Sequence, residues 1–530
     1  MVYFVKWTNP RCKVSGIMGS GSNVEITMNS VGWNKIHNKG QSSVTDQYLP
    51  AYYENAYELL DEEGEWYLDT HSGYLYYKPR FFEDMRNAVV EMPMLEKLVT
   101  IRGTADNNAE NLEFRDVDFM YSTWMDPTAN GYLADLQNNH QSGMTGALPD
   151  AAIELSYVNN ITFDGCSFAK LGITAMKMTE GVKHCRIVGN EFYDISGTAI
   201  SLGVPSGDYD KYINPTDDRY IVRDNQITDN YIHHTGMDYK SAAALSAAFP
   251  KNTQISYNEI YASPYSGMHL GYGWNTYVEK GTATEELVVE GNYIHNVMND
   301  KVYDGGAIYT MGKTSGTEEN YNQISRNYIK DVKNHYGALY PDEGSQFWEF
   351  SGNVIDLSRY PLYYGTGGGN GVPAKWLHLW TNTITNNKLV NNYATTANAK
   401  NAGADNIFEQ PTVCKPGSWP QEAKDIIAAA GIRGQYAERY TGGLQDVEAL
   451  TEYVAQTGDE IVLSVTATTG KGKLYDFRNA QIYIENSEPD VAEIGRDFRG
   501  TAMSPGETVV RIAIVEKGIL QTFEIAISVV

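Results

Sequence analysis

Short runs of alternating apolar and polar residues recur through the middle of the chain, and Asn or Gly residues separate them. The runs at 182–188, 253–257 and 287–290 are each followed by a second short run that begins near Gly, such as 197–200. A period of two over a short run predicts a β-strand, and no amphipathic stretch of helical length separates these runs. The pattern therefore predicts an all-β fold and argues against alternating strands and helices.

One four-residue element recurs along the same region: a small or polar residue, then Asn, then any residue, then an aliphatic residue or Phe. Its Asn positions are Asn190, Asn230, Asn258, Asn292, Asn327, Asn353 and Asn387. Their uneven spacing indicates short rungs joined by loops of variable length. We expect a right-handed parallel β-helix, a solenoid in which the Asn side chains form a ladder and the aliphatic residues stack inward.

The solenoid is predicted to occupy residues 95–400, and the sections around it have different patterns. Residues 1–94 are expected to form a mainly β N-terminal section, with a hairpin at 65–77. Residues 401–444 are expected to form a linker with a short helix. Residues 445–530 return to alternating strands, which predicts a small separate β-sandwich.

Two neighbouring rungs, at 302–312 and 334–345, depart from the repeat. A stacked scaffold gains nothing from irregularity, so such departures indicate function. Asp304 enters the first rung, whereas Asp342 and Glu343 leave the second, and both rungs are rich in aromatic residues. Hydrolysis of a glycosidic bond uses such a pair, because one carboxyl group protonates the leaving oxygen and the other serves as base or nucleophile. We predict catalytic roles for these three acids.

The alignment of the rungs sets the expected floor of a binding groove. We align Ile308 with Leu270 of the preceding rung and with the corresponding aliphatic residue of the next. This alignment places Tyr309 beside Tyr340 on the outward face of the sheet. It places His269 on the same face, two positions earlier.

The same alignment separates the two aspartates. Asp304 lies four positions before the aligned aliphatic residue of its rung, and Asp342 lies three positions after its own. A straight strand would hold them about 7 × 3.3 Å, roughly 23 Å, apart, whereas glycoside hydrolysis needs ~5–10 Å. Either Gly305 and Gly306 fold Asp304 back over the sheet, or the catalytic pair is Asp342 with Glu343 or another acid.

Aromatic and histidine side chains near these rungs are candidates for substrate binding, because rings suit the apolar faces of sugars and imidazoles can hydrogen-bond sugar hydroxyls. The same side chains can equally serve packing. The candidate substrate-binding residues are Trp124, His269, Trp274, Tyr309, His335, Tyr340 and Trp348.

The composition narrows the classes of function. The net charge of −25 over 530 residues repels a polyanion, so nucleic-acid binding is excluded. No apolar run is long enough to span a membrane, so membrane insertion is not expected. The abundance of Tyr, with 39 residues, and of Trp, with 9, is common among secreted bacterial enzymes that act on carbohydrates.

The sequence shows no spacing typical of a metal site, and no cofactor is expected. A structural calcium site is the one exception, because Asp208, Asp210, Asp217 and Asp218 share an inserted loop; solvated turn acids are the favoured interpretation. The four cysteines are interpreted as buried small residues, although Cys166 and Cys185 lie in neighbouring rungs and could form a disulfide.

Five motifs, at 65–69, 75–79, 121–124, 304–310 and 340–345, occur in an order that resembles bacterial right-handed β-helix glycosidases, and glycoside hydrolase family 141 in particular. Family 120 xylosidases and family 110 galactosidases share part of the rung pattern. The resemblance covers roughly residues 1–440 and implies hydrolysis of a glycosidic bond, with fucosidase or xylanase activity as the known range of the family. It implies that Asp304 and Asp342 are the paired catalytic aspartates.

The C-terminal strands carry a resemblance of their own. The segments at 488–494 and 505–512 resemble bacterial immunoglobulin-like modules of the group 2 type, which usually serve as spacers.

The sequence thus predicts a glycoside hydrolase that acts on an oligo- or polysaccharide of plant or host origin. A polysaccharide lyase and a non-catalytic glycan-binding β-helix remain alternatives. We expect a secreted, periplasmic or cell-surface protein whose signal peptide is absent from this chain.

Overall fold

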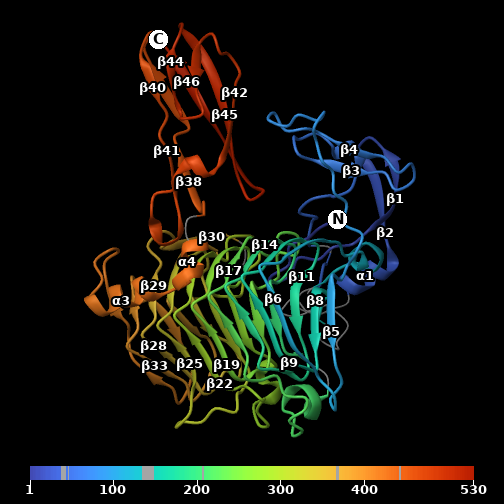
Figure 1. Cartoon of the computed structure of the whole chain (residues 1–530), viewed down its shortest axis with the longest axis vertical. Coiled ribbons are helices and arrows are strands. Elements are labelled where there is room, and N and C mark those ends of the chain that lie inside the picture. The colour runs from blue at the N-terminus through green and yellow to red at the C-terminus, as the bar shows by residue number, and fades with distance from the viewer. Residues whose placement is uncertain (38–42, 46, 134–147, 206–207, 366–368, 441–442) are drawn as a thin grey trace. The chain divides into compact units, whose positions relative to one another are not determined.

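A computed structural model describes the chain except for residues 38–42, 46, 134–147, 206–207, 366–368 and 441–442. The described residues are mostly in β-strands, and three long parallel sheets wind as a right-handed parallel β-helix (Figure 1). The fold class predicted from the repeat is therefore confirmed. None of the described helices has the length and apolar character needed to cross a membrane.

Successive coils stack their strands in register, and we name the three resulting sheets the site sheet, the second sheet and the third sheet. The site sheet contains β5 (Val99–Arg102), β8 (Ala151–Ser156), β11 (Thr174–Met178), β15 (Ile200–Leu202), β18 (Leu245–Ala247), β21 (Met268–Gly271), β24 (Ile308–Met311), β27 (Leu339–Pro341), β32 (Leu377–Leu379) and β35 (Ala399–Asn401). The second sheet contains β7 (Asp118–Ser122), β10 (Ser167–Leu171), β14 (Glu191–Ile195), β17 (Tyr231–His233), β20 (Glu259–Ser263), β23 (Tyr293–Val297), β26 (Tyr328–Val332), β29 (Val354–Asp356), β34 (Tyr393–Ala394) and β37 (Thr412–Val413). The third sheet contains β6 (Ala109–Arg115), β9 (Val158–Asp164), β12 (Val182–Lys183), β13 (Arg186–Val188), β16 (Gln226–Thr228), β19 (Lys251–Ser256), β22 (Glu285–Glu290), β25 (Asn322–Ser325), β28 (Trp348–Ser351), β33 (Lys388–Val390) and β36 (Ile407–Phe408).

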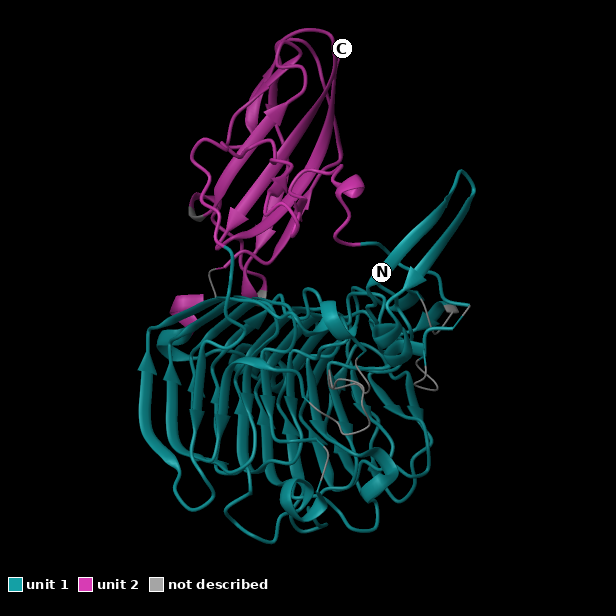
Figure 2. Ribbon diagram, turned by 90° about the vertical axis from the view of Figure 1, so that its right-hand side faces the viewer, with its two compact units in different colours: residues 1–53, 92–436 teal, residues 54–91, 437–530 magenta. Residues whose placement is uncertain are grey.

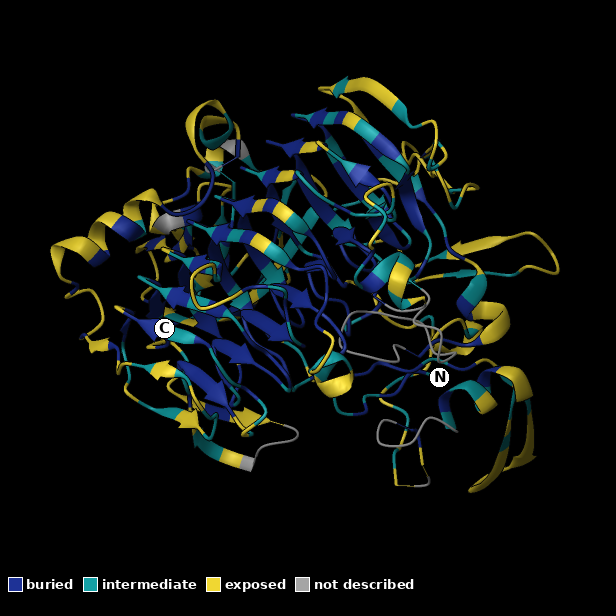
Figure 3. Ribbon diagram, turned by 90° about the horizontal axis from the view of Figure 1, so that it is seen from below, coloured by how far each residue is buried: buried dark blue, intermediate teal, exposed yellow. Residues whose placement is uncertain are grey.

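The core of the solenoid fills the space between the three sheets. Inward side chains of successive coils meet in register, so that Ile260 pairs with Ile294 and Phe168 stacks on Phe192 with ring centroids 4.5 Å apart. Buried positions follow the strands, whereas exposed positions gather in loops and hairpins (Figure 3). Each coil thus buries apolar area against the next, which is the main favourable contribution to the stability of such a stack.

A ladder of asparagines links the coils at the turn before the second sheet. In each step, the Nδ2 of one Asn donates to the Oδ1 of the next at 2.9–3.0 Å. The ladder contains Asn190, Asn230, Asn258, Asn292, Asn327, Asn353 and Asn392. The residue before each Asn has a left-handed backbone, for example a φ of 64° at Gly291, which explains why Gly and polar residues recur there.

One member of the predicted ladder, Asn387, is wrong. Asn387 precedes β33 of the third sheet, so its Nδ2 donates to the Oδ1 of Asn406 at 3.1 Å and not to the main ladder. Asn392, which precedes β34 of the second sheet, occupies the position that the repeat analysis gave to Asn387.

The described chain divides into two compact units, neither of which is continuous in sequence (Figure 2). The first unit contains residues 1–53 and 92–436, and the second contains residues 54–91 and 437–530. The boundaries expected at residues 94, 400 and 444 stay predictions about domains.

The first unit adds short elements to the solenoid. They are β1 (Val14–Ser20), β2 (Asn23–Met28), α1 (Ser30–His37), α2 (Asp126–Asn130), the one-turn helices η2 (Tyr209–Ile213) and η3 (Trp274–Tyr277), β30 (Leu362–Gly365), β31 (Gly369–Pro373), α3 (Gln421–Ala429) and the start of α4 (Gly434–Tyr440). Helix α3 confirms the short helix that the sequence predicts in the linker.

The second unit joins the segment 54–91 to the C-terminal strands. The Arg511 guanidinium pairs with the Glu63 carboxylate at 3.0 Å, and the rings of Phe82 and Tyr483 stack with centroids 4.6 Å apart. The segment contains η1 (Tyr57–Leu59) and the hairpin of β3 (Trp66–Leu68) and β4 (Leu75–Tyr77), which the sequence predicts.

Three small sheets formed by the C-terminal strands of the second unit pack around one apolar core. The strands and short helices of this part are β38 (Asp446–Ala449), β39 (Glu452–Ala455), β40 (Glu460–Val462), β41 (Val465–Thr468), η4 (Gly470–Gly472), η5 (Phe477–Asn479), β42 (Gln481–Asn486), β43 (Ala492–Ile494), β44 (Arg499–Ala502), β45 (Gly506–Glu516) and β46 (Ile519–Val529).

All four cysteines are buried free thiols. The disulfide considered between Cys166 and Cys185 is therefore not formed, and the interpretation of the cysteines as small buried residues is confirmed.

Candidate active site

The outward face of the site sheet carries a column of polar and aromatic side chains. In β21, β24 and β27 the inward residues Met268 and Ile308 pair in register, and so do the outward residues His269 and Tyr309. Tyr309 in turn pairs with Tyr340, as the sequence predicts. The predicted offset of His269 is wrong by two positions, because Met268 and Leu270 both face inward and the sequence alignment chose the second of them.

A tight turn brings Asp304 to this column. Its backbone has a φ of 68°, and its carbonyl oxygen accepts a hydrogen bond of 2.8 Å from the Tyr265 hydroxyl. The next carbonyl, of Gly305, accepts from the Asn334 side chain, and the Gly306 N–H donates to the Ser266 hydroxyl at 3.2 Å. These bonds fix the turn, which points the Asp304 carboxyl group back over the sheet.

Asp342 follows β27 and is buried, with 5% of its surface exposed. Its Oδ2 accepts hydrogen bonds from the Trp274 indole at 2.9 Å and from the Tyr309 hydroxyl, and its Oδ1 accepts from the Trp380 indole at 2.5 Å. Three neutral groups thus supply hydrogen bonds to the Asp342 carboxyl group, which forms no ion pair with the described residues.

The two carboxyl groups meet over one pair of rings. The Tyr340 hydroxyl donates to the Asp304 Oδ1 at 2.9 Å, Tyr309 donates to Asp342, and the two rings lie 4.9 Å apart edge to face. The separation of about 23 Å expected for a straight strand therefore does not apply, because the left-handed turn at Asp304 reverses the chain. Asp304 folds back over the sheet, as in the first of the two alternatives, but the left-handed φ lies at Asp304 itself and not at Gly305 or Gly306.

Glu343 lies at the edge of the site and is half-buried. Its Oε2 accepts a hydrogen bond of 2.8 Å from the side chain of Asn275, which is exposed. Burial and the neighbouring Asp342 raise the pKa of Glu343 above its ordinary value.

Burial and neighbouring charges raise the pKa of Asp304 and of the two tyrosines beside it. Burial, and then the charge of Asp342, raise the pKa of Asp304 to about 7. Burial and the two carboxyl groups also raise the pKa of the Tyr309 and Tyr340 hydroxyls well above the ordinary value, so both phenols stay protonated as donors. Near neutral pH the site therefore holds one carboxyl group that can give up a proton and one that is supplied with hydrogen-bond donors.

This shift predicts a pH-dependent effect of Asp304 on stability. Its pKa is about 7 in the folded chain and about 3.9 in an unfolded one, so the folded state binds the proton more tightly. Ionisation of Asp304 therefore lowers the free energy of unfolding by up to about 4 kcal/mol as the pH rises from 4 to above 7. We expect Asp304→Asn to raise the melting temperature at pH 8.5 and to leave it nearly unchanged at pH 4. A variant that is no more stable than the wild type at pH 8.5 would contradict the shift.

Two of the predicted binding residues lie elsewhere. Trp348 is fully buried inside the solenoid, on the third sheet, and cannot contact a bound sugar while the fold is intact. Trp124 packs in a separate buried cluster, where its ring contacts Tyr132 and Tyr239.

The other predicted residues gather around the two aspartates. Tyr309 and Tyr340 are also buried, so they hold the carboxyl groups and do not offer their faces to solvent. The His269 ring lies 4.6 Å from Tyr309, and the indole of Trp274 donates to Asp342. His335 lies in the segment that leads into β27, and its ring is 4.3 Å from that of Tyr336.

Sequence reasoning missed three residues of the site. Trp380 is 42% exposed and donates to Asp342, while the His378 ring lies 4.9 Å from Tyr340 and the Tyr336 ring stacks on Tyr340. The register of β27 with β32 relates Trp380 to the site: Leu339 pairs with Leu377, so Trp380 occupies the position in its coil that Asp342 has in the preceding one.

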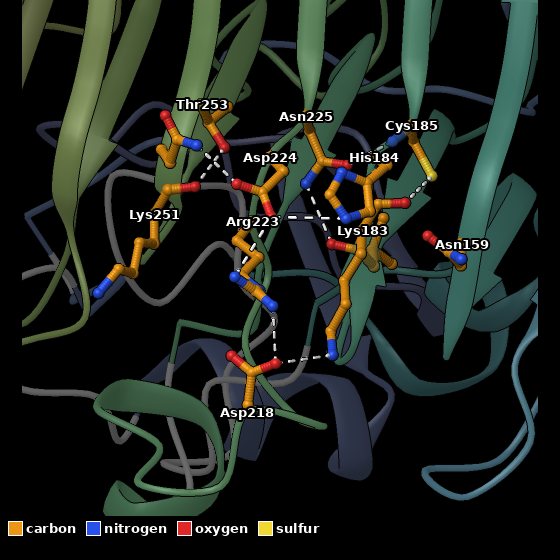
Figure 4. A network of polar contacts seen from close by, with 12 residues as sticks. Asn159, Lys183, His184, Cys185, Asp218, Arg223, Asp224, Asn225, Lys251 and Thr253 are labelled. Carbon is orange, nitrogen blue, oxygen red and sulfur yellow. Dashed lines mark hydrogen bonds and ion pairs between the residues drawn. The ribbon is translucent and has the colours of Figure 1, made fainter.

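The structure shows no metal site in its described part, where no group of three or more His, Cys, Asp or Glu side chains could hold an ion. Three of the acids considered for calcium have other partners, and Figure 4 shows those of Asp218. Asp218 pairs with Arg223 at 2.7 Å and with Lys183 at 3.5 Å. Asp217 pairs with Arg219 at 2.7 Å, and Asp208 accepts a backbone hydrogen bond within its own turn.

Comparison with known proteins finds a similar fold in a solved structure. No family model matches the chain, and no curated protein matches its sequence. One similar solved structure is named "Glycoside hydrolase": it superposes with a TM-score of 0.61 at 23% sequence identity, over 82% of this chain and 70% of that one. At this identity the likeness shows that the two chains share a fold.

Proposed function

We propose that the protein is a glycoside hydrolase in which Asp304 is the general acid and Asp342 the base or nucleophile. The observation that carries the proposal is the pair itself: two carboxyl groups held over adjacent tyrosines on the outward face of the solenoid, with the pKa of Asp304 raised to about 7. The glycoside hydrolase with the same fold supports it.

The chemistry follows from the two environments. Asp304, with a pKa of about 7, carries its proton at slightly acidic pH and can donate it to the glycosidic oxygen as the bond breaks. Asp342, held by two indoles and a phenol, can attack the anomeric carbon or activate a water molecule. The half-exposed indoles of Trp274 and Trp380 offer apolar surface to a sugar ring beside the carboxylate.

The finer assignments rest on the resemblance found in the sequence. An α-L-fucosidase or a xylanase of family 141 is the activity we propose to test first. We also propose that the C-terminal sheets form an immunoglobulin-like spacer and that the protein acts outside the bacterial cytoplasm on plant or host glycans.

A screen of plant and host glycans tests the class of function. The expected result is release of new reducing ends without a product that absorbs in the near ultraviolet. An unsaturated, absorbing product would identify a lyase, and binding without any release would identify a non-catalytic glycan-binding protein.

The indole of Trp380 gives a separate prediction about positioning. Trp380→Phe keeps an aromatic face but removes the hydrogen bond to Asp342, so we expect kcat to fall by about tenfold with little change in KM, as for the loss of one hydrogen bond to a charged group. Trp66→Phe, an exposed indole of the second unit, is the matched control. Equal kinetics in Trp380→Phe and the control would remove this role.

A further inference from the structure

Two lysines near the candidate active site carry charges that no described acidic side chain balances. Lys375 precedes β32, is half-buried, and donates from its Nζ to the His335 carbonyl oxygen at 2.5 Å. Lys400, in β35, is exposed and pairs in register with His378. Neither lysine forms an ion pair within the described part of the chain.

At the opposite end of the same outward column, two lysines pair with an acidic side chain. There Lys177 lies in register with Glu154 and pairs with it at 2.8 Å, and Lys97 pairs with the same carboxylate at 3.1 Å. Lys375 and Lys400 have no such acidic partner among the described residues, although the chain has a net charge of −25. Burial, and then the charge of Lys400, lower the pKa of Lys375.

Two buried imidazoles border these lysines. The Nδ1 atoms of His335 and His378 have no hydrogen-bond partner among the described residues, although each side chain is nine-tenths buried. Burial, and then the Lys375 charge, lower the pKa of His378 to about 3 and that of His335 to about 4. Both rings are therefore neutral near pH 7 and can each offer an N–H to an acceptor.

The cluster is continuous with the proposed catalytic pair. The His378 ring lies 4.9 Å from Tyr340, whose hydroxyl donates to Asp304. Lys400 lies one further coil along, so it is about 10 Å from Tyr340 at the usual strand spacing. A sugar unit adjacent to the bond that is cleaved can reach this distance.

We propose that Lys375, Lys400 and the two histidines bind an acidic group of the substrate, a sugar carboxylate or sulfate, so that the enzyme acts on an acidic glycan. The inference rests on the proposed glycosidase function. Two ammonium groups supply charge-assisted hydrogen bonds to such an anion, and the imidazoles satisfy its remaining oxygens. The anion in turn supplies the negative partner that these two lysines lack among the described residues.

Binding of single sugars tests the inference without turnover. Glucuronate, galacturonate and glucose 6-sulfate are titrated against the full chain by calorimetry, with glucose and galactose as neutral counterparts of the same rings. We expect the acidic sugars to bind and the neutral ones to bind at least about tenfold more weakly. Comparing the carboxylates with the sulfate identifies the acidic group.

Substitution of the two lysines tests whether the acidic sugar binds beside them. Lys375→Met and Lys400→Met are each expected to weaken binding of the acidic sugar by about tenfold. Lys388→Met, which removes a lysine paired with Glu349 on the third sheet, is the matched control and leaves affinity unchanged. Equal affinities for acidic and neutral sugars, no binding of acidic sugars at tens of millimolar, or equal losses in the control would each overturn the inference.

The two proposals fail separately. A chain that binds acidic sugars through Lys375 and Lys400 but hydrolyses no glycan would refute the glycosidase and keep the binding site. Hydrolysis of a neutral glycan with kcat/KM unchanged in both lysine variants would keep the glycosidase and refute the binding site.

Discussion

Replacing Asp342 with Asn is expected to lower kcat on a glycoside substrate by about 10³-fold or more. The amide keeps the shape of the side chain but is a far weaker nucleophile and base, and its NH₂ group would face one of three hydrogen-bond donors. The measurement is steady-state hydrolysis of the glycan found in the screen, with circular dichroism to confirm folding.

Asp356→Asn is the matched control for this variant, because Asp356 lies on the outward face of the second sheet in the same solenoid. It should hydrolyse the substrate like the wild type. Full activity of a folded Asp342→Asn protein would remove Asp342 from the catalytic pair.

Asp304→Asn is expected to show a loss that depends on the leaving group. A general acid contributes about 10²–10⁴-fold when the departing oxygen needs a proton, and much less when the leaving group is a stable phenolate. We therefore expect a large loss of kcat/KM on the natural glycan and a small loss on a nitrophenyl glycoside of the same sugar. Equal losses on both substrates would show that Asp304 does not act as the acid.

Much of the fold was predictable because a solenoid repeats its local pattern. Successive Asn turns and inward aliphatic residues carry the same information in each coil, so one irregular copy does not obscure the architecture. The ladder error at Asn387 arose because two different turns of a coil use Asn in the same way. No local pattern in residues 54–91 predicts that this segment belongs to the second unit. Its place there depends on contacts between residues far apart in the sequence, such as the Arg511–Glu63 pair across 448 residues.

The candidate site was predictable only in part. Asp304 and Asp342 break the repeat and were identified for that reason, but their proximity depends on a left-handed φ at Asp304, which a strand-based distance does not include. Trp380 lies in a coil whose repeat is regular, and only the register of β27 with β32 reveals its relation to Asp342. Lys375 and Lys400 stand out through missing ion pairs, which a sequence cannot show.

The pH dependence of kcat/KM, measured for the wild type and for Asp304→Asn on the same glycoside, shows directly whether Asp304 is the general acid. Because kcat/KM reports the ionisation of the free enzyme, and the pKa of Asp304 is about 7, the wild-type rate should fall as the pH rises through about 7. We expect this falling limb to disappear in Asp304→Asn, which should retain only a low rate that no longer declines there. An unchanged falling limb in the variant would show that another group is the acid and would contradict the account.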